Sequence, residues 1–287
     1  MFERISNSFA LARSSWDVLR QDKQLIVFPI VSGIACLFVM AGFALPFVAQ
    51  PAWLDFIRNN QNLRQPPPLF YVLAFAYYFC NYFVIIFCNA ALISCAMIRF
   101  NGGRPTIGDG FGAAMSRLPQ ILAWALVSAT VGVLLKMVEN ANEKIGSFIS
   151  ALLGTAWTIM TFFVVPVLVV EKTGPIDAVK RSLSILRKTW GEALVGNMGI
   201  GFFMFLMSIP GILLVVLGVA LLAIGHLALL GGVVIAGAVL YFIALSAVSS
   251  ALHGIFLGAM YQYAANGEVP DGFERGTLKR AFARKDK

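Results

Sequence analysis

The chain has 287 residues, of which 59% are hydrophobic and only 13% are charged. Soluble globular domains carry about 25% charged residues, so this composition excludes a soluble protein and leaves no room for a large soluble domain. The formal net charge is +8, but the basic residues are dispersed along the chain. Because they form no basic domain, we expect no nucleic-acid partner.

Six apolar runs are each long enough to cross a hydrocarbon core of ~30 Å. Eighteen of the 22 Lys and Arg residues fall before the first run, between runs two and three, between runs four and five, or after the sixth. Such a bias marks the cytoplasmic side of a membrane protein, so both termini are predicted to be cytoplasmic. The predicted spans are residues 25–49, 69–98, 119–138, 146–170, 193–224 and 228–264.

Two segments ahead of spans share a sequence pattern. Residues 181–190 read RSLSILRKTW and residues 8–16 read SFALARSSW. The aligned pairs are Ser182 with Ser8, Arg187 with Arg13 and Trp190 with Trp16. Each segment has an apolar stripe at helical spacing and a terminal Trp, and the second also has a basic face. This pattern is typical of a helix lying among lipid headgroups.

These segments supply the predicted contacts with anionic headgroups or a protein partner. The second segment follows Gly174-Pro175, which suits a helix start because proline is favoured in the first turn. We also expect Glu171 to form an ion pair with a basic residue of this segment. The predicted contact residues are Arg13, Trp16, Lys180, Arg181, Arg187, Lys188 and Trp190.

A weaker copy of the pattern begins at Ile107, ahead of the third span. The sequence therefore predicts an all-α, polytopic membrane protein with six transmembrane helices in three hairpins. Each hairpin would be preceded by a cytoplasmic amphipathic interfacial helix. The predicted organisation is one transmembrane domain over 1–264, with similar units 1–98, 99–171 and 172–264, and a basic cytoplasmic tail over 265–287.

Polar residues within spans are the places to look for function. In span two, Tyr78, Asn81, Tyr82 and Asn89 share one helix face, which would either form interhelical hydrogen bonds or line a polar pocket. His253 in span six is either a buried hydrogen-bonding residue or a protonatable site.

Two further groups in the spans have structural interpretations. Span four carries three threonines, which we expect to bond back to carbonyls of their own helix. In span six, small residues four apart would let another helix approach closely. The threonines are Thr155, Thr158 and Thr161, and the small residues are Ser246, Ser250, Gly254 and Gly258.

Three stretches resemble an uncharacterised family of bacterial and archaeal multi-pass membrane proteins. They read FCNAALISCAMIRFNGGRPTIGDGF (87–111), TFFVVPVLVVEKTGPIDAVKRSLSILRKTWGE (161–192) and YQYAANGEVPDGF (261–273). A looser similarity exists to the non-catalytic membrane domain attached to some glycerophosphodiester phosphodiesterases. The resemblance implies a multi-pass protein of a bacterial inner (plasma) membrane and assigns no catalytic or binding residue.

No nucleophile–base pair, phosphate-binding loop or metal-ligand motif accompanies the polar residues. We therefore expect no enzymatic activity, no cofactor and no metal site. The sequence favours a structural or accessory membrane protein that packs with partner membrane proteins or a second copy, or organises lipid. The alternative is a transporter or a lipid- or amphiphile-binding protein with a cavity between its hairpins.

Overall fold

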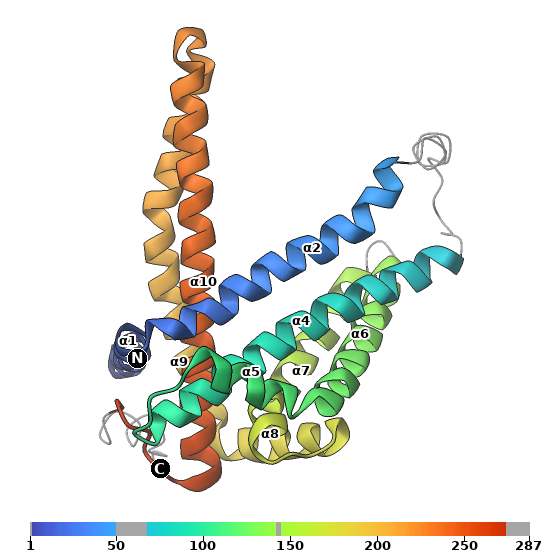
Figure 1. Cartoon of the computed structure of the whole chain (residues 1–287), viewed down its shortest axis with the longest axis vertical. Coiled ribbons are helices and arrows are strands. Elements are labelled where there is room, and N and C mark those ends of the chain that lie inside the picture. The colour runs from blue at the N-terminus through green and yellow to red at the C-terminus, as the bar shows by residue number, and fades with distance from the viewer. Residues whose placement is uncertain (1, 50–67, 142–144, 274–287) are drawn as a thin grey trace. The chain divides into compact units, whose positions relative to one another are not determined.

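The computed structural model describes residues 2–49, 68–141 and 145–273, and every regular element in these ranges is helical (Figure 1). Side chains are described for residues 10–45, 71–139, 145–187, 200–225 and 227–273. The α-helices are α1 (Phe2–Gln21), α2 (Val27–Ala49), α4 (Pro68–Phe100), α5 (Ile107–Met115), α6 (Leu118–Ala141), α7 (Gly146–Met160), α8 (Val164–Val170), α9 (Pro175–Ala223) and α10 (Ala228–Asn266). Two short 3₁₀ helices, η1 (Lys23–Ile26) and η2 (Gly225–Leu227), precede α2 and α10.

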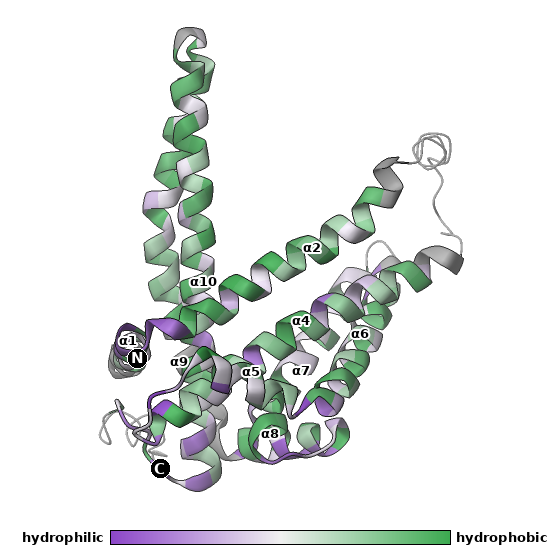
Figure 2. Cartoon of the chain, in the orientation of Figure 1, coloured by the Kyte–Doolittle hydropathy of each residue, from purple (hydrophilic) through white to green (hydrophobic). Residues whose placement is uncertain are grey.

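Within the described residues, six segments are helical, long and apolar enough to cross a membrane, and their apolar character is visible along the helices in Figure 2. Their ends lie within a few residues of the predicted spans, except that the fifth begins at Ile200 and not at residue 193. The predicted all-α chain with six spans is therefore confirmed. The six segments are Lys23–Leu45, Tyr71–Phe100, Leu118–Glu139, Gly146–Val170, Ile200–Ala223 and Ala228–Asn266.

The chain forms two compact units, which we describe separately. Unit 1 comprises Met1–Pro29, Cys95–Ile107 and Arg187–Lys287, and unit 2 comprises Ile30–Ser94 and Gly108–Leu186. These units reflect contacts, whereas the predicted division into three repeats reflects sequence similarity. The three repeats therefore remain a prediction.

Proline and glycine mark several helix ends. α4 begins at Pro68 and α9 begins at Pro175, the start predicted for that segment. α10 ends at Gly267, whose φ of 73° is left-handed and whose N–H bonds the carbonyl of Tyr263 at 2.9 Å. This is the usual role of a glycine after a helix, because it lacks the Cβ that opposes this backbone conformation.

The expected surface segment before span five is not a separate helix. α9 runs without interruption from Pro175 to Ala223, and so covers both that segment and the span. Helices α1 and α5, by contrast, are separate elements ahead of α2 and α6. Whether these segments lie at a membrane interface remains a prediction.

The buried face of α1 overlaps the predicted apolar stripe in part. Leu11, Ala12, Ser15, Val18 and Leu19 are all buried, and the helix packs on α10 within unit 1. Ala12 and Leu19 belong to the predicted stripe, whereas Trp16, which also belongs to it, is 37% exposed. Ser15 can occupy the buried face because its hydroxyl donates to the carbonyl of Leu11 at 3.0 Å.

The two aligned segments have matching burial at three consecutive positions, although Ala10 is half-buried and its counterpart Ser184 is exposed. Leu11 and Ala12 in α1 are buried, and so are their counterparts Ile185 and Leu186 in α9. The next residue in each segment, Arg13 or Arg187, is exposed. The sequence pattern thus corresponds to one arrangement of buried and exposed positions.

Helices α9 and α10 form a tightly packed hairpin within unit 1. A Cβ built on Gly231 of α10 would lie 2.7 Å from the backbone nitrogen of Leu222 and 2.8 Å from the carbonyl oxygen of Gly218, both in α9. A Cβ on Gly211 would lie 2.8 Å from the rings of Tyr241 and Phe242. Glycine is therefore required for this close approach of helices, as is common between membrane helices.

Candidate functional site: polar contacts of the membrane helices

The fourth span is broken where α7 gives way to α8. Residues 161–163 form a turn between them, so backbone groups there lack regular helical partners. The N–H of Phe163 donates to the hydroxyl of Ser182 in α9 at 3.0 Å, and both residues are completely buried. A neighbouring helix thus satisfies a backbone group that could not remain unpaired in an apolar environment.

The threonines of α7 bond to their own helix, as predicted. Thr155, Thr158 and Thr161 donate to the carbonyls four residues earlier at 2.8, 2.9 and 2.8 Å. The last bond holds the end of α7 directly before the break. These hydroxyls therefore serve backbone satisfaction in span four.

Charged groups hold the far end of α8. The Nε of Arg117 donates to the carbonyl of Val169 at 3.2 Å, which places a cation at the C-terminus of this helix, where it is favourable. Directly after the helix, a carboxylate oxygen of Glu171 accepts from Nε of Arg181 at 2.8 Å. The predicted pairing of Glu171 with a basic residue of the α9 segment is thus confirmed.

The predicted polar face of span two lies on α4 in unit 2. Asn81 donates to the carbonyl of Tyr77 in its own helix at 2.9 Å. The rings of Tyr78 and Tyr82 stack with centroids 6.3 Å apart, and a Cβ on Gly132 of α6 would lie 3.3 Å from the Tyr82 ring and hydroxyl. Asn89 is half-buried. Tyr82 packs against α6 and the Asn81 amide is used within α4, an arrangement that fits helix packing.

The predicted residues of span six lie on α10 in unit 1. His253 is half-buried and has an interaction partner. In the proposed small-residue seam, Gly254 and Gly258 are buried whereas Ser246 and Ser250 are exposed. The two halves of this stripe therefore have different surroundings.

The predicted headgroup residues also divide into two groups. Lys180 forms an exposed ion pair with Asp177 at 3.3 Å, and Arg181 is paired with Glu171. Arg13 and Arg187 are exposed, and Trp16 is partly exposed. The side chains of Lys188 and Trp190 lie outside the described residues.

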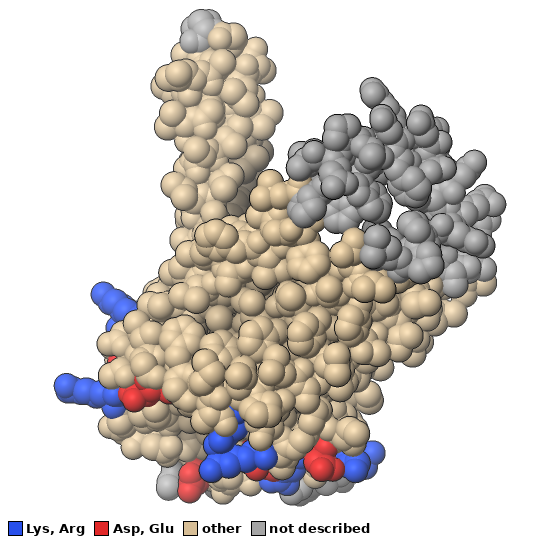
Figure 3. Space-filling view, turned by 45° about the vertical axis from the view of Figure 1, so that its right-hand side comes forward, with Lys and Arg blue, Asp and Glu red and all other residues tan. Residues whose placement is uncertain are grey.

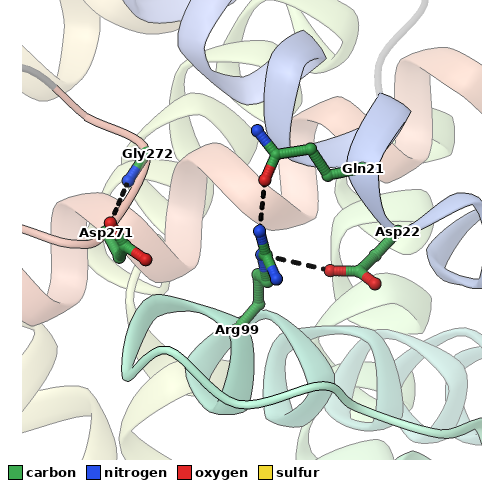
Figure 4. A network of polar contacts seen from close by, with 5 residues as sticks. All are labelled: Gln21, Asp22, Arg99, Asp271 and Gly272. Atoms are coloured by element: carbon green, nitrogen blue, oxygen red, sulfur yellow. Dashed lines mark hydrogen bonds and ion pairs between the residues drawn. The ribbon is translucent and has the colours of Figure 1, made fainter.

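A polar network in unit 1 joins segments that are far apart in sequence (Figure 4). Arg99, at the end of α4, donates to the side-chain oxygen of Gln21, and its Nε lies 3.2 Å from a carboxylate oxygen of Asp22. The Arg99 and Asp22 side chains are only 23% and 16% exposed. Both side chains are partly buried, so salt screens this pair less than it screens an exposed pair.

The segment after α10 folds back onto the same end of α4. The N–H of Asp271 donates to the carbonyl of Phe100 at 3.1 Å, and the rings of Phe100 and Phe273 meet edge to face at 5.8 Å. Gly272 has a φ of 87°, and a Cβ there would lie 3.1 Å from Val18 of α1. Residues 271–273 thereby connect α1 and α4 to the end of α10.

Sequence reasoning identified neither Ser182 as the partner of Phe163 nor Arg99 as the centre of a network. Ser182 was part of the repeated pattern, and Arg99 entered only the charge count. A signal for Arg99 was present, because it is the first charged residue after a long apolar run. Its partners at residues 21 and 22 are distant in sequence and carry no shared motif.

The described residues contain no group of three or more His, Cys, Asp or Glu side chains placed to hold a metal ion. A comparison with curated proteins found no match. The similarity to the phosphodiesterase-associated membrane domain therefore remains a hypothesis. A family model described as a family of unknown function, DUF6159, matches residues 69–272, and the chain belongs to this family.

Proposed function

We propose that the protein is a non-catalytic, structural or accessory component of a bacterial inner membrane, with cytoplasmic termini, that packs with membrane proteins or organises lipid. One observation carries this proposal: several hydroxyl and amide groups within the spans are engaged by backbone, although the buried side-chain oxygens of Gln120 and Gln262 have no hydrogen-bond partner among the described residues. Examples are Asn81 with Tyr77, Ser94 with Ala90, and Thr155 with Ala151, with bond lengths of 2.7–2.9 Å. Groups used in this way stabilise helices and are not available to act on a substrate.

The groups available to contact lipid or a partner protein lie on α1 and on the first part of α9, the segments predicted to be surface helices. Arg13 and Arg187 are exposed at aligned positions, and Ile176 at the start of α9 is 70% exposed. Exposed apolar and basic residues together suit a membrane surface, where each cation near anionic lipid contributes ~1 kcal/mol. They would equally suit a partner protein with acidic residues in the same region.

The test is extraction of the protein with its surrounding lipid in polymer-bounded membrane discs. We expect either a protein recovered at constant stoichiometry, which includes a second copy, or enrichment of anionic phospholipid over the bulk membrane. Arg13→Gln combined with Arg187→Gln should lower that enrichment by up to about thirtyfold, at ~1 kcal/mol for each cation.

Lys180→Gln is the matched control, because Lys180 lies in the same segment but is paired with Asp177. It should leave both lipid and protein recovery unchanged. Recovery of the wild-type chain as a lone copy, in lipid of bulk composition, would contradict the proposal.

A second candidate function rests on a groove between α6 and α7 in unit 2. Its volume is about 430 Å³, within the range of ~300–1,000 Å³ for small-molecule sites, and it is lined by apolar side chains. Such a groove could hold the chain of a lipid or another amphiphile. The lining residues are Val131, Leu134, Leu135, Val138, Leu153, Ala156, Trp157 and Met160.

This alternative is tested with a photoreactive fatty-acyl phospholipid in reconstituted membranes. If the groove holds an acyl chain, crosslinks should map to its lining residues. Ala156→Phe, which fills the groove, should abolish them, whereas Ala151→Phe on the exposed surface of α7 should not. Crosslinks spread evenly around α6 and α7 would exclude a binding groove.

A further inference from the structure

The turn of the α9–α10 hairpin, residues 224–227, reads Ile-Gly-His-Leu; it includes His226 but no Asp, Glu, Lys or Arg. Residues 193–267 contain no Asp, Glu, Lys or Arg, and no blue or red side chain is visible on the described residues near this turn in Figure 3. Around the turn, Leu229 is 87% exposed, Leu230 is 53% exposed and Val233 is 66% exposed. Large exposed apolar surfaces on a protein mark a site that another apolar phase covers.

The α6–α7 turn provides a contrast within the same chain. There Lys136 and Glu139 form an exposed ion pair at 3.0 Å, and Glu143 and Lys144 follow in the sequence. Charged side chains of this kind are stable in water or among lipid headgroups. The α9–α10 turn has none, although both turns connect adjacent spans.

The α9–α10 turn is short, and two of its backbone N–H groups are bonded to carbonyls of the turn or of the end of α9. Only Ile224 separates α9 from η2, and η2 leads directly into α10. The N–H of Ile224 bonds the carbonyl of Leu221 at 3.2 Å, and the N–H of Leu227 bonds that of Ile224 at 2.7 Å. Hydrocarbon tolerates only backbone whose polar groups are bonded internally.

Polar side chains of the hairpin are satisfied internally as well. Within residues 200–245, the described polar side chains are Ser208 and Tyr241. Ser208 donates to the carbonyl of Phe205 at 2.6 Å, and the Tyr241 hydroxyl donates to the carbonyl of Met207. Phe205 and Met207 lie five and three residues before Pro210. Proline disrupts the regular helical hydrogen bonds in this part of α9.

The length of the hairpin sets the tilt that immersion of its turn requires. The 24-residue segment Ile200–Ala223 is by itself about 36 Å long at 1.5 Å per residue, against a core of ~30 Å. At the average tilt of ~20° it would still extend about 34 Å along the membrane normal, so the turn stays in hydrocarbon when the hairpin is inclined by about 34° or more, which is within the range of ~0–40° for membrane helices.

We propose that the turn of the α9–α10 hairpin, with its flanking leucines, stays in the hydrocarbon of the membrane and does not emerge into water. The surface around Leu229 is then a lipid-binding surface whose partners are acyl chains. This conclusion requires only that the chain spans a membrane, and it does not depend on the proposed function.

The experiment compares Leu229→Cys with Ile145→Cys. Both positions are exposed, at 87% and 57%, so neither substitution disturbs a packed core, and Ile145 lies beside the charged α6–α7 turn. Open membrane sheets are treated with a membrane-impermeant maleimide, which reaches both aqueous faces and makes orientation irrelevant. The wild-type chain gives the background of the four native cysteines.

We expect labelling at position 229 to be at least tenfold slower than at position 145, and equal at both positions after denaturation in sodium dodecyl sulfate. A fluorophore attached to Leu229→Cys should then be quenched more strongly by lipids labelled in the acyl chain than by lipids labelled in the headgroup. Comparable labelling at the two positions would overturn the proposal. Slow labelling without acyl-chain quenching would also overturn it, because protein would then cover the turn.

Discussion

The backbone N–H of Phe163 donates a hydrogen bond to the hydroxyl of Ser182 across 3.0 Å, and neither residue is exposed. The bond joins the break between α7 and α8 to α9. Phe163 lies in the turn where helical bonding is interrupted, so its N–H depends on a side chain from another helix. Ser182 therefore stabilises an irregular stretch of span four that would otherwise contain an unpaired donor.

Ser182→Ala should destabilise the protein by about 1–3 kcal/mol, the cost of leaving a buried donor unsatisfied. The substitution removes one oxygen atom and changes packing little. We expect a lower free energy of unfolding in detergent micelles and faster hydrogen exchange of the Phe163 amide.

Ser184→Ala is the matched control, since Ser184 lies two residues after Ser182 on the exposed side of α9. It should change neither the unfolding free energy nor the exchange rate of Phe163. Equal behaviour of the two variants would indicate that the Ser182 hydroxyl does not hold the break.

The spans could be predicted from sequence because hydropathy and length alone decide which segments suit hydrocarbon. The start of α9 at Pro175 was predictable from local backbone chemistry. The continuity of α9 into span five was not, because the helical spacing of an amphipathic segment does not indicate where the helix ends.

The buried side of each helix was harder to predict, because a pattern based on apolar residues assigns serine to the exposed side. Ser15 and Ser182 are both completely buried, and each uses its hydroxyl on a backbone group. Trp16 belongs to the apolar stripe of the sequence but is 37% exposed, because the buried face of α1 includes Ser15 instead. Such bonds depend on contacts between segments or on the rotation of a helix about its axis. The spacing of apolar residues along one segment determines neither.

The Arg99 network should also be measurable as stability. Arg99→Ala removes the partner of Asp22 and Gln21, and we expect a loss of about 1–3 kcal/mol for bonds involving a charged group. Arg99→Lys keeps the charge but cannot reproduce the planar fork that reaches both partners, so it should restore only part of the stability.

Arg20→Ala tests whether any basic residue in this region would have the same effect. Arg20 is exposed near the end of α1, one residue before Gln21. We expect the unfolding free energy of the Arg20→Ala variant to stay within ~0.5 kcal/mol of the wild-type value, as for most surface substitutions. A loss equal to that of Arg99→Ala would point to overall charge rather than the network.

Tyr241→Phe should weaken the α9–α10 hairpin by about 0.6–1.7 kcal/mol, the range measured for hydrogen bonds between membrane helices. Its hydroxyl donates to the Met207 carbonyl, three residues before Pro210. Combining the change with Pro210→Ala should reduce this loss, because alanine restores regular helical bonding in this turn. An unfolding free-energy cycle measures the coupling, and a loss of equal size in both backgrounds would show that the bond does not compensate for the proline.

Gly231→Ala should separate α9 from α10. The added Cβ would lie 2.7 Å from the Leu222 nitrogen and 2.8 Å from the Gly218 oxygen, and backbone atoms cannot move aside as a flexible side chain can. We expect a loss of about 1–3 kcal/mol, typical of overpacking. Gly232→Ala adds the same methyl group to the same helix, where no atom lies within 4 Å, so it should be neutral or stabilise the helix by up to ~1 kcal/mol. Unfolding of both variants in detergent measures the difference, and equal stability would mean that the close contact at Gly231 does not hold the hairpin together.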